Sequence, residues 1–180
     1  MRRREFIWLV GGAALVWPST ARAQQRRKIV GVLQAQEPTS PPIPFIQAFL
    51  TRLGELGWVE GQTVHVEFRG APTIERMTGL AADFVRMKAD VIYAPTSRQV
   101  EAASQATKTI PIVFSGVGYP VVAGYAASLA RPGGNITGLS NPTIELIAKE
   151  LEILKEAFPN ASLIGGLWDA VSPITPVVKS

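Results

Sequence analysis

The chain has 180 residues, 47% of them hydrophobic, which is enough for one domain with a buried core but too few for two full domains. Residues 1–23 hold four of the 18 basic and one of the 14 acidic residues, so the remaining chain, with 14 basic and 13 acidic residues, lacks the basic excess that nucleic acid binding requires. The absence of cysteine excludes disulfides, thiolate metal sites, cysteine nucleophiles and a lipid-modified cysteine.

Residues 1–23 have the features of a secretory signal. Three arginines from Arg2 precede an apolar segment, Phe6 to Trp17, and a cleavage motif, Ala21-Arg22-Ala23. The letters RREFI also resemble a twin-arginine export signal. We expect cleavage before Gln24 and a mature protein that is free in a bacterial periplasm. The alternative is an uncleaved membrane anchor, for which an apolar segment of about a dozen residues is short.

The next part of the chain alternates between strand and helix patterns. Lys28–Gln36 predicts a buried strand that ends in polar residues, and Glu37–Pro44 predicts a proline-rich loop. Apolar residues at helical spacing from Ile46 to Leu53 predict a helix that Gly57 ends. Thr63–Arg69 alternates between apolar and polar residues, which is typical of a half-exposed strand at the edge of a sheet.

A second strand–helix unit follows. Thr73–Lys88 predicts an amphipathic helix, and Asp90–Ala94 predicts a third strand. Thr96 followed by Gln99 predicts a capping box that opens a helix to about Lys108. The free backbone N–H groups and the positive dipole at that helix start would favour a carboxylate or another anion.

The stretch from Ile110 to Ser140 predicts a ligand site. Ile110–Phe114 predicts a fourth buried strand, and Ser115–Pro120 predicts a loop of small and kinked residues after it. Open α/β sheets usually bind ligands in the crevice at the carboxyl ends of their strands. Pro132–Asn135 predicts a structural corner, and Ile136–Leu139 predicts a short strand.

The remaining sequence predicts one helix and one strand. Asn141 as N-cap and Pro142 at the first helical position predict a helix through Phe158. Ser162–Trp168 predicts another buried strand, and Asp169–Ser180 predicts no element. Alternating strands and helices imply parallel strands with right-handed crossovers. The predicted fold class is therefore a three-layer, doubly wound α/β sheet, in which an edge position for the second strand suits the order 2-1-3-4-5.

The candidate ligand contacts follow the first, third and fourth predicted strands. They are Gln34, Gln36, Thr96, Ser97, Ser115, Gly116, Tyr119 and Pro120. We expect hydrogen bonds from Thr96, Ser97 and Ser115 and a stacking surface from Tyr119. Each residue also has a local explanation, as a helix cap, a tight turn or a solvated glutamine.

Catalytic and metal-binding signals are missing from the sequence. The only histidine, His65, falls on the polar side of its predicted strand with Glu67 and Arg69, and no nucleophile is evident as its partner. The glycines never take the spacing of a phosphate-binding loop, and no metal motif occurs. We expect no catalytic residue, metal or cofactor.

Four strings carry a family resemblance: RRREF, ADVIYAPT, TIPIVFSGVGYPV and above all SLARPGGNITGLS. They resemble ABC-transporter substrate-binding proteins, close to the group that binds tryptophan and other aromatic amino acids, and the resemblance runs from the leader to about Trp168. It implies a periplasmic-binding-protein fold, type I-like, with two α/β lobes that close on a small ligand. It also implies an inner-membrane ABC permease as partner.

The sequence departs from this family in two ways. Where family members commonly read G-D-P-V, this chain has a tyrosine, Tyr119, so a phenol replaces a carboxylate that could meet a ligand ammonium. Family members are also much longer. The expected organisation is a signal peptide at 1–23, a solute-binding lobe at 24–138, and a crossover with an incomplete second lobe at 139–180.

Two alternatives remain open. One is a shortened, non-transporting paralogue or a module that self-associates through residues 141–168. The other is a periplasmic α/β hydrolase, which would need a histidine or carboxylate beside Ser97 or Ser115.

Overall fold

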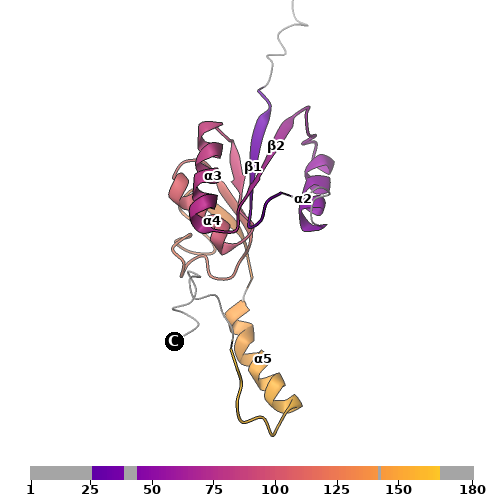
Figure 1. Cartoon of the computed structure of the whole chain (residues 1–180), viewed down its shortest axis with the longest axis vertical. Helices are drawn as coiled ribbons and strands as arrows, with labels where there is room; N and C mark the ends of the chain where they lie inside the picture. The colour runs from indigo at the N-terminus through magenta and orange to yellow at the C-terminus, as the bar shows by residue number, and fades with distance from the viewer. Residues whose placement is uncertain (1–25, 39–43, 142, 167–180) are drawn as a thin grey trace, which may run out of the picture.

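The computed structural model describes residues 26–38, 44–141 and 143–166, which form a parallel sheet with helices on both faces and one further helix, α5 (Figure 1). The strands are β1 (Lys28–Gln34), β2 (Val64–Gly70), β3 (Val91–Tyr93), β4 (Ile112–Val117) and β5 (Ile136–Ser140). The helices are α2 (Pro44–Glu55), α3 (Ile74–Arg86), α4 (Ser97–Ala106) and α5 (Thr143–Ala157). The order β2-β1-β3-β4-β5 confirms the predicted doubly wound sheet, with the second strand at its edge.

The core has two layers, one on each face of the sheet. Helices α3 and α4 pack on one face, where Leu33 and Phe84 are fully buried, and α2 packs on the other (Figure 1). On the α2 side, Ile46 packs with Val32 and Tyr93. Val32 and Leu33 are neighbours in β1 and both fully buried, because successive side chains of a strand point to opposite faces. Burial on both faces explains the continuous apolar run of the first strand.

Strand β5 lies very close to β4 at Gly138. A Cβ atom at this position would overlap the carbonyl oxygen of Phe114 and lie 2.6 Å from its ring. Only glycine fits here without a shift of the backbone, so the small residue in the NITG string holds the edge strand in register.

Several helix ends agree with the sequence predictions. Helix α2 ends at Glu55, and Gly57 has φ +86°, the left-handed conformation expected of a glycine stop. Thr73 caps α3, since its Oγ1 accepts a hydrogen bond from the N–H of Arg76 at 3.4 Å. Lys88, just after α3, also takes a left-handed conformation, with φ +55°.

Two predictions about strands are wrong. Strand β4 extends to Val117, so Ser115 and Gly116 are strand residues rather than loop residues. The cause is long-range pairing, because the N–H of Ser115 donates to the Pro95 carbonyl at 3.3 Å and Gly116 forms a bridge with Thr96. Residues 162–166 form no strand, since none of the described strands lies beside them to accept hydrogen bonds.

Other predictions concern residues outside the described ranges. The leader, Pro142, and residues 167–180 belong to this group, while the predicted helix after Asn141 is confirmed as α5. None of the helices in the described ranges is both long and apolar enough to cross a bilayer.

Candidate ligand-binding site

The carboxyl ends of β1 and β3 form a switch point of the sheet. The two strands are neighbours, but the chain leaves β1 toward α2 on one face and leaves β3 toward α4 on the other. Such a divergence opens a crevice between the two connections. A cavity of about 410 Å³ lies there, lined by Gln34, Ala35, Gln36, Glu37, Phe45, Pro95, Thr96 and Gln99. Its volume suits a small molecule.

The polar groups of this cavity are mostly uncharged. Gln34 and Gln36 offer amides from the end of β1, and the hydroxyl of Thr96 donates a hydrogen bond to Oε1 of Gln99. Glu37 is the one charged residue of the lining, and it lies 3.6 Å from a guanidinium nitrogen of Arg76. A neutral or zwitterionic molecule is the best electrostatic match for such a lining.

The start of α4 differs from the predicted capping box. Thr96 makes no side-chain hydrogen bond to the helix backbone, because its hydroxyl is directed to the side chain of Gln99. Gln99 is only 3% exposed, and its amide therefore lies in the wall of the cavity rather than over the helix end. The first N–H groups of α4 lack this side-chain cap, and their dipole favours a negatively charged group.

Gly70, at the end of β2, positions Gln36. A Cβ atom at Gly70 would overlap the carbonyl oxygen of Gln36 and lie 3.0 Å from Cβ of Gln34. The N–H of Ala71 also donates to the carbonyl of Gln34 at 3.3 Å. The end of β2 thus lies beside the end of β1 and the residues that follow it, and this contact positions the two glutamines at the cavity.

Tyr93 links the α2 side of the core to the carboxyl-terminal half of β4. Its ring stacks on Phe49 of α2, with centroids 4.7 Å apart and planes 7° apart. Its phenol oxygen lies 2.7 Å from Oγ of Ser115. The hydroxyl of Ser115 is thereby held beside β3, and the Thr96–Gly116 bridge joins β4 to the segment between β3 and α4.

A second cavity, of about 330 Å³, lies beyond β4 and β5. Its lining is Gly118, Tyr119, Pro120, Val121, Val122, Leu129 and Ser140. Most of these side chains are apolar, so the cavity suits an aliphatic or aromatic group. Ser140 Oγ donates to the carbonyl of Gly118 at 3.2 Å, which closes one side of it.

Tyr125 ties the segment after β4 to the start of α4. Its hydroxyl donates to the carbonyl of Ser97 at 3.3 Å, and its N–H donates to the carbonyl of Pro120 at 2.7 Å. Burial, together with the nearby charge of Glu101, raises the pKa of Tyr125 to about 12. The phenol therefore stays protonated at neutral pH and remains a donor.

The predicted contacts gather at one edge of the sheet. Gln34, Gln36 and Thr96 line the first cavity, while Tyr119 and Pro120 line the second. Ser97, Ser115 and Gly116 line neither, but Ser115 and Gly116 join β4 to the β3 end, and Ser97 begins α4. Contact of any of these residues with a ligand stays a prediction.

Sequence reasoning missed five residues that line the first cavity: Ala35, Glu37, Phe45, Pro95 and Gln99. Gln99 carried a signal, because it was the partner of Thr96 in the predicted capping box. Phe45 carried none, since its place depends on how α2 packs against the sheet.

His65 lies away from the candidate site. Its ring nitrogens are 3.0 Å from Glu60 and 3.3 Å from Glu67, on and beside the edge strand β2. The hydroxyl of Ser115 is paired with Tyr93 instead. Within the described ranges, no three histidines or carboxylates are grouped so that they could hold a metal ion.

Comparisons with known proteins identify relatives of this chain. The family model for the ABC transporter substrate binding protein matches residues 45–173. A tyrosine-binding protein of Clostridioides difficile is 34% identical over 149 residues, which are 81% of this chain and 41% of the relative.

Two solved structures share the fold. A conserved domain protein of Vibrio cholerae has a TM-score of 0.72 and 28% identity over 86% of this chain and 51% of that chain. An ABC domain of Streptococcus pneumonia in complex with L-Trp has a TM-score of 0.69 and 23% identity, over 85% of this chain and 51% of that chain, a likeness that shows the fold alone. The chain thus spans about half the length of the proteins it matches.

Proposed function

Because the chain belongs to the family of ABC transporter substrate-binding proteins, we propose that it binds a small amino acid with an aromatic side chain and does not change it chemically. One observation carries this proposal: Gln34, Gln36, Thr96 and Gln99 surround a single cavity at the switch point of the sheet. The name of the tyrosine-binding relative supports the aromatic class. The leader, if it acts as predicted, takes the protein to the periplasm, where an inner-membrane ABC permease is its transport partner.

The two ends of an amino acid have matching groups in this cavity. The uncapped N–H groups of α4 offer a place for the carboxylate, beside the hydroxyl of Thr96. Tyr119 replaces the carboxylate that relatives commonly carry at this position. We therefore expect the ammonium group of the ligand to contact the side-chain oxygens of the glutamines or of Glu37. Phe45 in this cavity, with 52% of its surface exposed, and Tyr119 in the second cavity offer apolar surface for an aromatic side chain.

Isothermal titration of the chain from Gln24 with tyrosine, tryptophan and phenylalanine tests the proposal, with leucine and lysine as comparison ligands. We expect binding of at least one aromatic amino acid, and Thr96→Val should weaken it about tenfold or more, because the proposed hydrogen bond between the threonine hydroxyl and the ligand is lost. The matched control is Thr137→Val, an exposed position in β5 that lines neither cavity. No heat with any of these ligands, from a protein whose circular dichroism shows it to be folded, would exclude the proposal.

A second candidate is a module that self-associates through residues 141–168, and the surface of α5 favours it. Leu151, Leu154 and Phe158 recur at helical spacing and are 45%, 38% and 60% exposed. An apolar stripe of this kind is stabilised when another surface covers it. Sedimentation equilibrium distinguishes this candidate, since it requires twice the mass of one chain without any ligand.

A further inference from the structure

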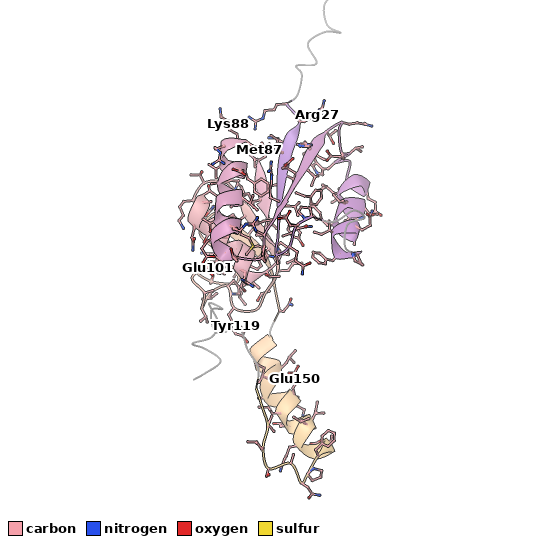
Figure 2. All side chains as sticks on the ribbon, viewed as in Figure 1. Arg27, Met87, Lys88, Glu101, Tyr119 and Glu150 are labelled. Atoms are coloured by element: carbon pink, nitrogen blue, oxygen red, sulfur yellow. The ribbon has the colours of Figure 1, made fainter. Side chains whose placement is uncertain are left out.

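A cluster of basic residues lies at the amino-terminal edge of the sheet, at the opposite end of the strands from the candidate site. We call it the basic edge, and it consists of Arg26, Arg27, Lys28 and Lys88, all of them exposed. Figure 2 shows Arg27 and Lys88 at one end of the sheet and Tyr119 toward the other. A guanidinium nitrogen of Arg26 donates to the carbonyl of Lys88 at 2.6 Å, which holds the two segments together.

The basic edge carries more positive than negative charge. Asp90 is its nearest carboxylate and lies 2.9 Å from Lys28 and 3.9 Å from Arg26. One carboxylate therefore faces two cations, and Arg27 and Lys88 have no ion pair within the described part of the chain. The remaining positive charge can therefore attract an anionic partner.

Exposed apolar side chains adjoin the basic edge. Leu56, Trp58 and Val59 follow α2 and are 61%, 43% and 39% exposed. A cavity of about 360 Å³ joins Arg26 and Lys28 to Leu56 and Trp58 in one lining, so the charges and the indole share one surface. A polyanion such as nucleic acid would pair with the positive charges, but it would make no favourable contact with the exposed leucine and valine side chains.

We propose that this surface docks on an anionic lipid bilayer, with the basic edge against the headgroups and Trp58 at their interface with the acyl chains. Basic residues beside a partly exposed tryptophan match the layered chemistry of a membrane surface, where cations meet lipid phosphates and indole rings lie at the headgroup level.

The position of the chain start supports the same partner. The basic edge begins at Arg26, and eight residues separate it from Trp17, the last residue of the apolar leader segment. Even a fully extended chain of that length spans no more than about 30 Å. Before any cleavage, a leader inserted in the bilayer would therefore keep the basic edge closer to the membrane surface than the rest of the folded sheet.

The test follows Trp58 fluorescence in the chain from Gln24 carrying Trp168→Phe, in which Trp58 is the sole tryptophan. Vesicles of phosphatidylglycerol with phosphatidylcholine should shift its emission to shorter wavelength, and they should bind the protein at least about tenfold more tightly than phosphatidylcholine alone. Added salt should weaken the binding, because it screens exposed charges.

Variants separate the basic edge from general charge. Arg27→Glu with Lys88→Glu should lower vesicle binding about tenfold or more, and Leu56→Gln should lower it by a smaller factor. The matched control, Arg76→Glu with Lys149→Glu, makes the same change of net charge away from this edge and should leave binding unchanged. Circular dichroism confirms that each variant is folded.

Three outcomes would overturn the proposal. They are no binding to anionic vesicles, equal loss of binding in the two double variants, and binding to heparin or duplex DNA as tight as to vesicles without a shift of Trp58 emission. The last result would assign the basic edge to a soluble polyanion.

Discussion

Asp90 fastens the start of β1 to the start of β3. Its carboxylate accepts hydrogen bonds from the N–H of Ile29 at 2.8 Å and from Nζ of Lys28 at 2.9 Å. Both bonds favour the ionised form, the backbone bond most strongly, and they hold the pKa of Asp90 below its ordinary value of 3.8. A carboxylate of this kind stabilises the fold only while it is charged.

Asp90→Ala should therefore lower the free energy of unfolding at neutral pH by about 1–3 kcal/mol, because two charge-assisted hydrogen bonds are lost. Since the pKa is lower in the folded than in the unfolded chain, this contribution is present above the ordinary value and disappears as the pH falls through the folded-state pKa. Urea unfolding at neutral and acidic pH measures the difference between wild type and variant, which should shrink in acid.

Asp83→Ala is the matched control for this prediction. It removes a pair with Arg86 on the surface of α3, and such pairs contribute little. We expect a change in unfolding free energy below about 0.5 kcal/mol. An equal loss in the two variants would mean that the hydrogen bonds of Asp90 have no special role.

For single residues, the sequence predicted that the candidate side chains lie near the strand ends, but it did not predict which side chains they meet. Gln34 and Thr96 could be predicted because each follows a strand pattern, and the strand ends share one edge. The Tyr93–Ser115 hydrogen bond could not, since it joins side chains 22 residues apart whose meeting depends on the register of β3 and β4.

The elements of the fold depend on contacts of very different range. The bounds of α3 follow from local signals, a threonine cap at Thr73 and the spacing of its apolar residues. The bounds of β4 do not, because its last residues are held by β5 and by the segment after β3. This explains why a strand predicted to end at Phe114 continues to Val117.

Gly138→Ala tests the fit between β4 and β5. The added methyl group would overlap the carbonyl of Phe114, so we expect a loss of about 1–3 kcal/mol in unfolding free energy. The control is Gly79→Ala in α3, where a Cβ atom meets nothing within 4 Å. It should stabilise the protein by about 0.5–1 kcal/mol, since glycine disfavours helix. Thermal or urea unfolding of both variants checks the pair, and a neutral Gly138→Ala would contradict the observed closeness.

The whole molecule combines a sheet that has helices on both faces with a helix, α5, whose apolar residues are exposed. Residues 28–140 follow the predicted α/β order, because alternating strands and helices leave few possible topologies. The surroundings of α5 could not be predicted. Its apolar stripe indicates that contact with another surface is favourable, but it does not identify that surface.

If the protein self-associates through α5, Leu151→Glu should weaken the dimer about tenfold or more, because a charge would be buried at the interface. Leu129→Glu makes the same exchange at a residue that is 72% exposed and lies outside residues 141–168, and it should leave the dimer intact. Light scattering over a range of concentrations measures both. A wild-type chain that is monomeric throughout would exclude this assembly.

The Phe49–Tyr93 stack has a practical consequence. Two rings held nearly parallel in a fixed core give a defined near-ultraviolet circular dichroism signal, and the oxygen of one of them reaches a serine on the fourth strand. A solute that forms a hydrogen bond with this serine in place of Tyr93 would change the position of the Tyr93 ring in the stack. We expect near-ultraviolet circular dichroism to report the binding of any solute that displaces this serine hydroxyl, without a dye or a radioactive ligand.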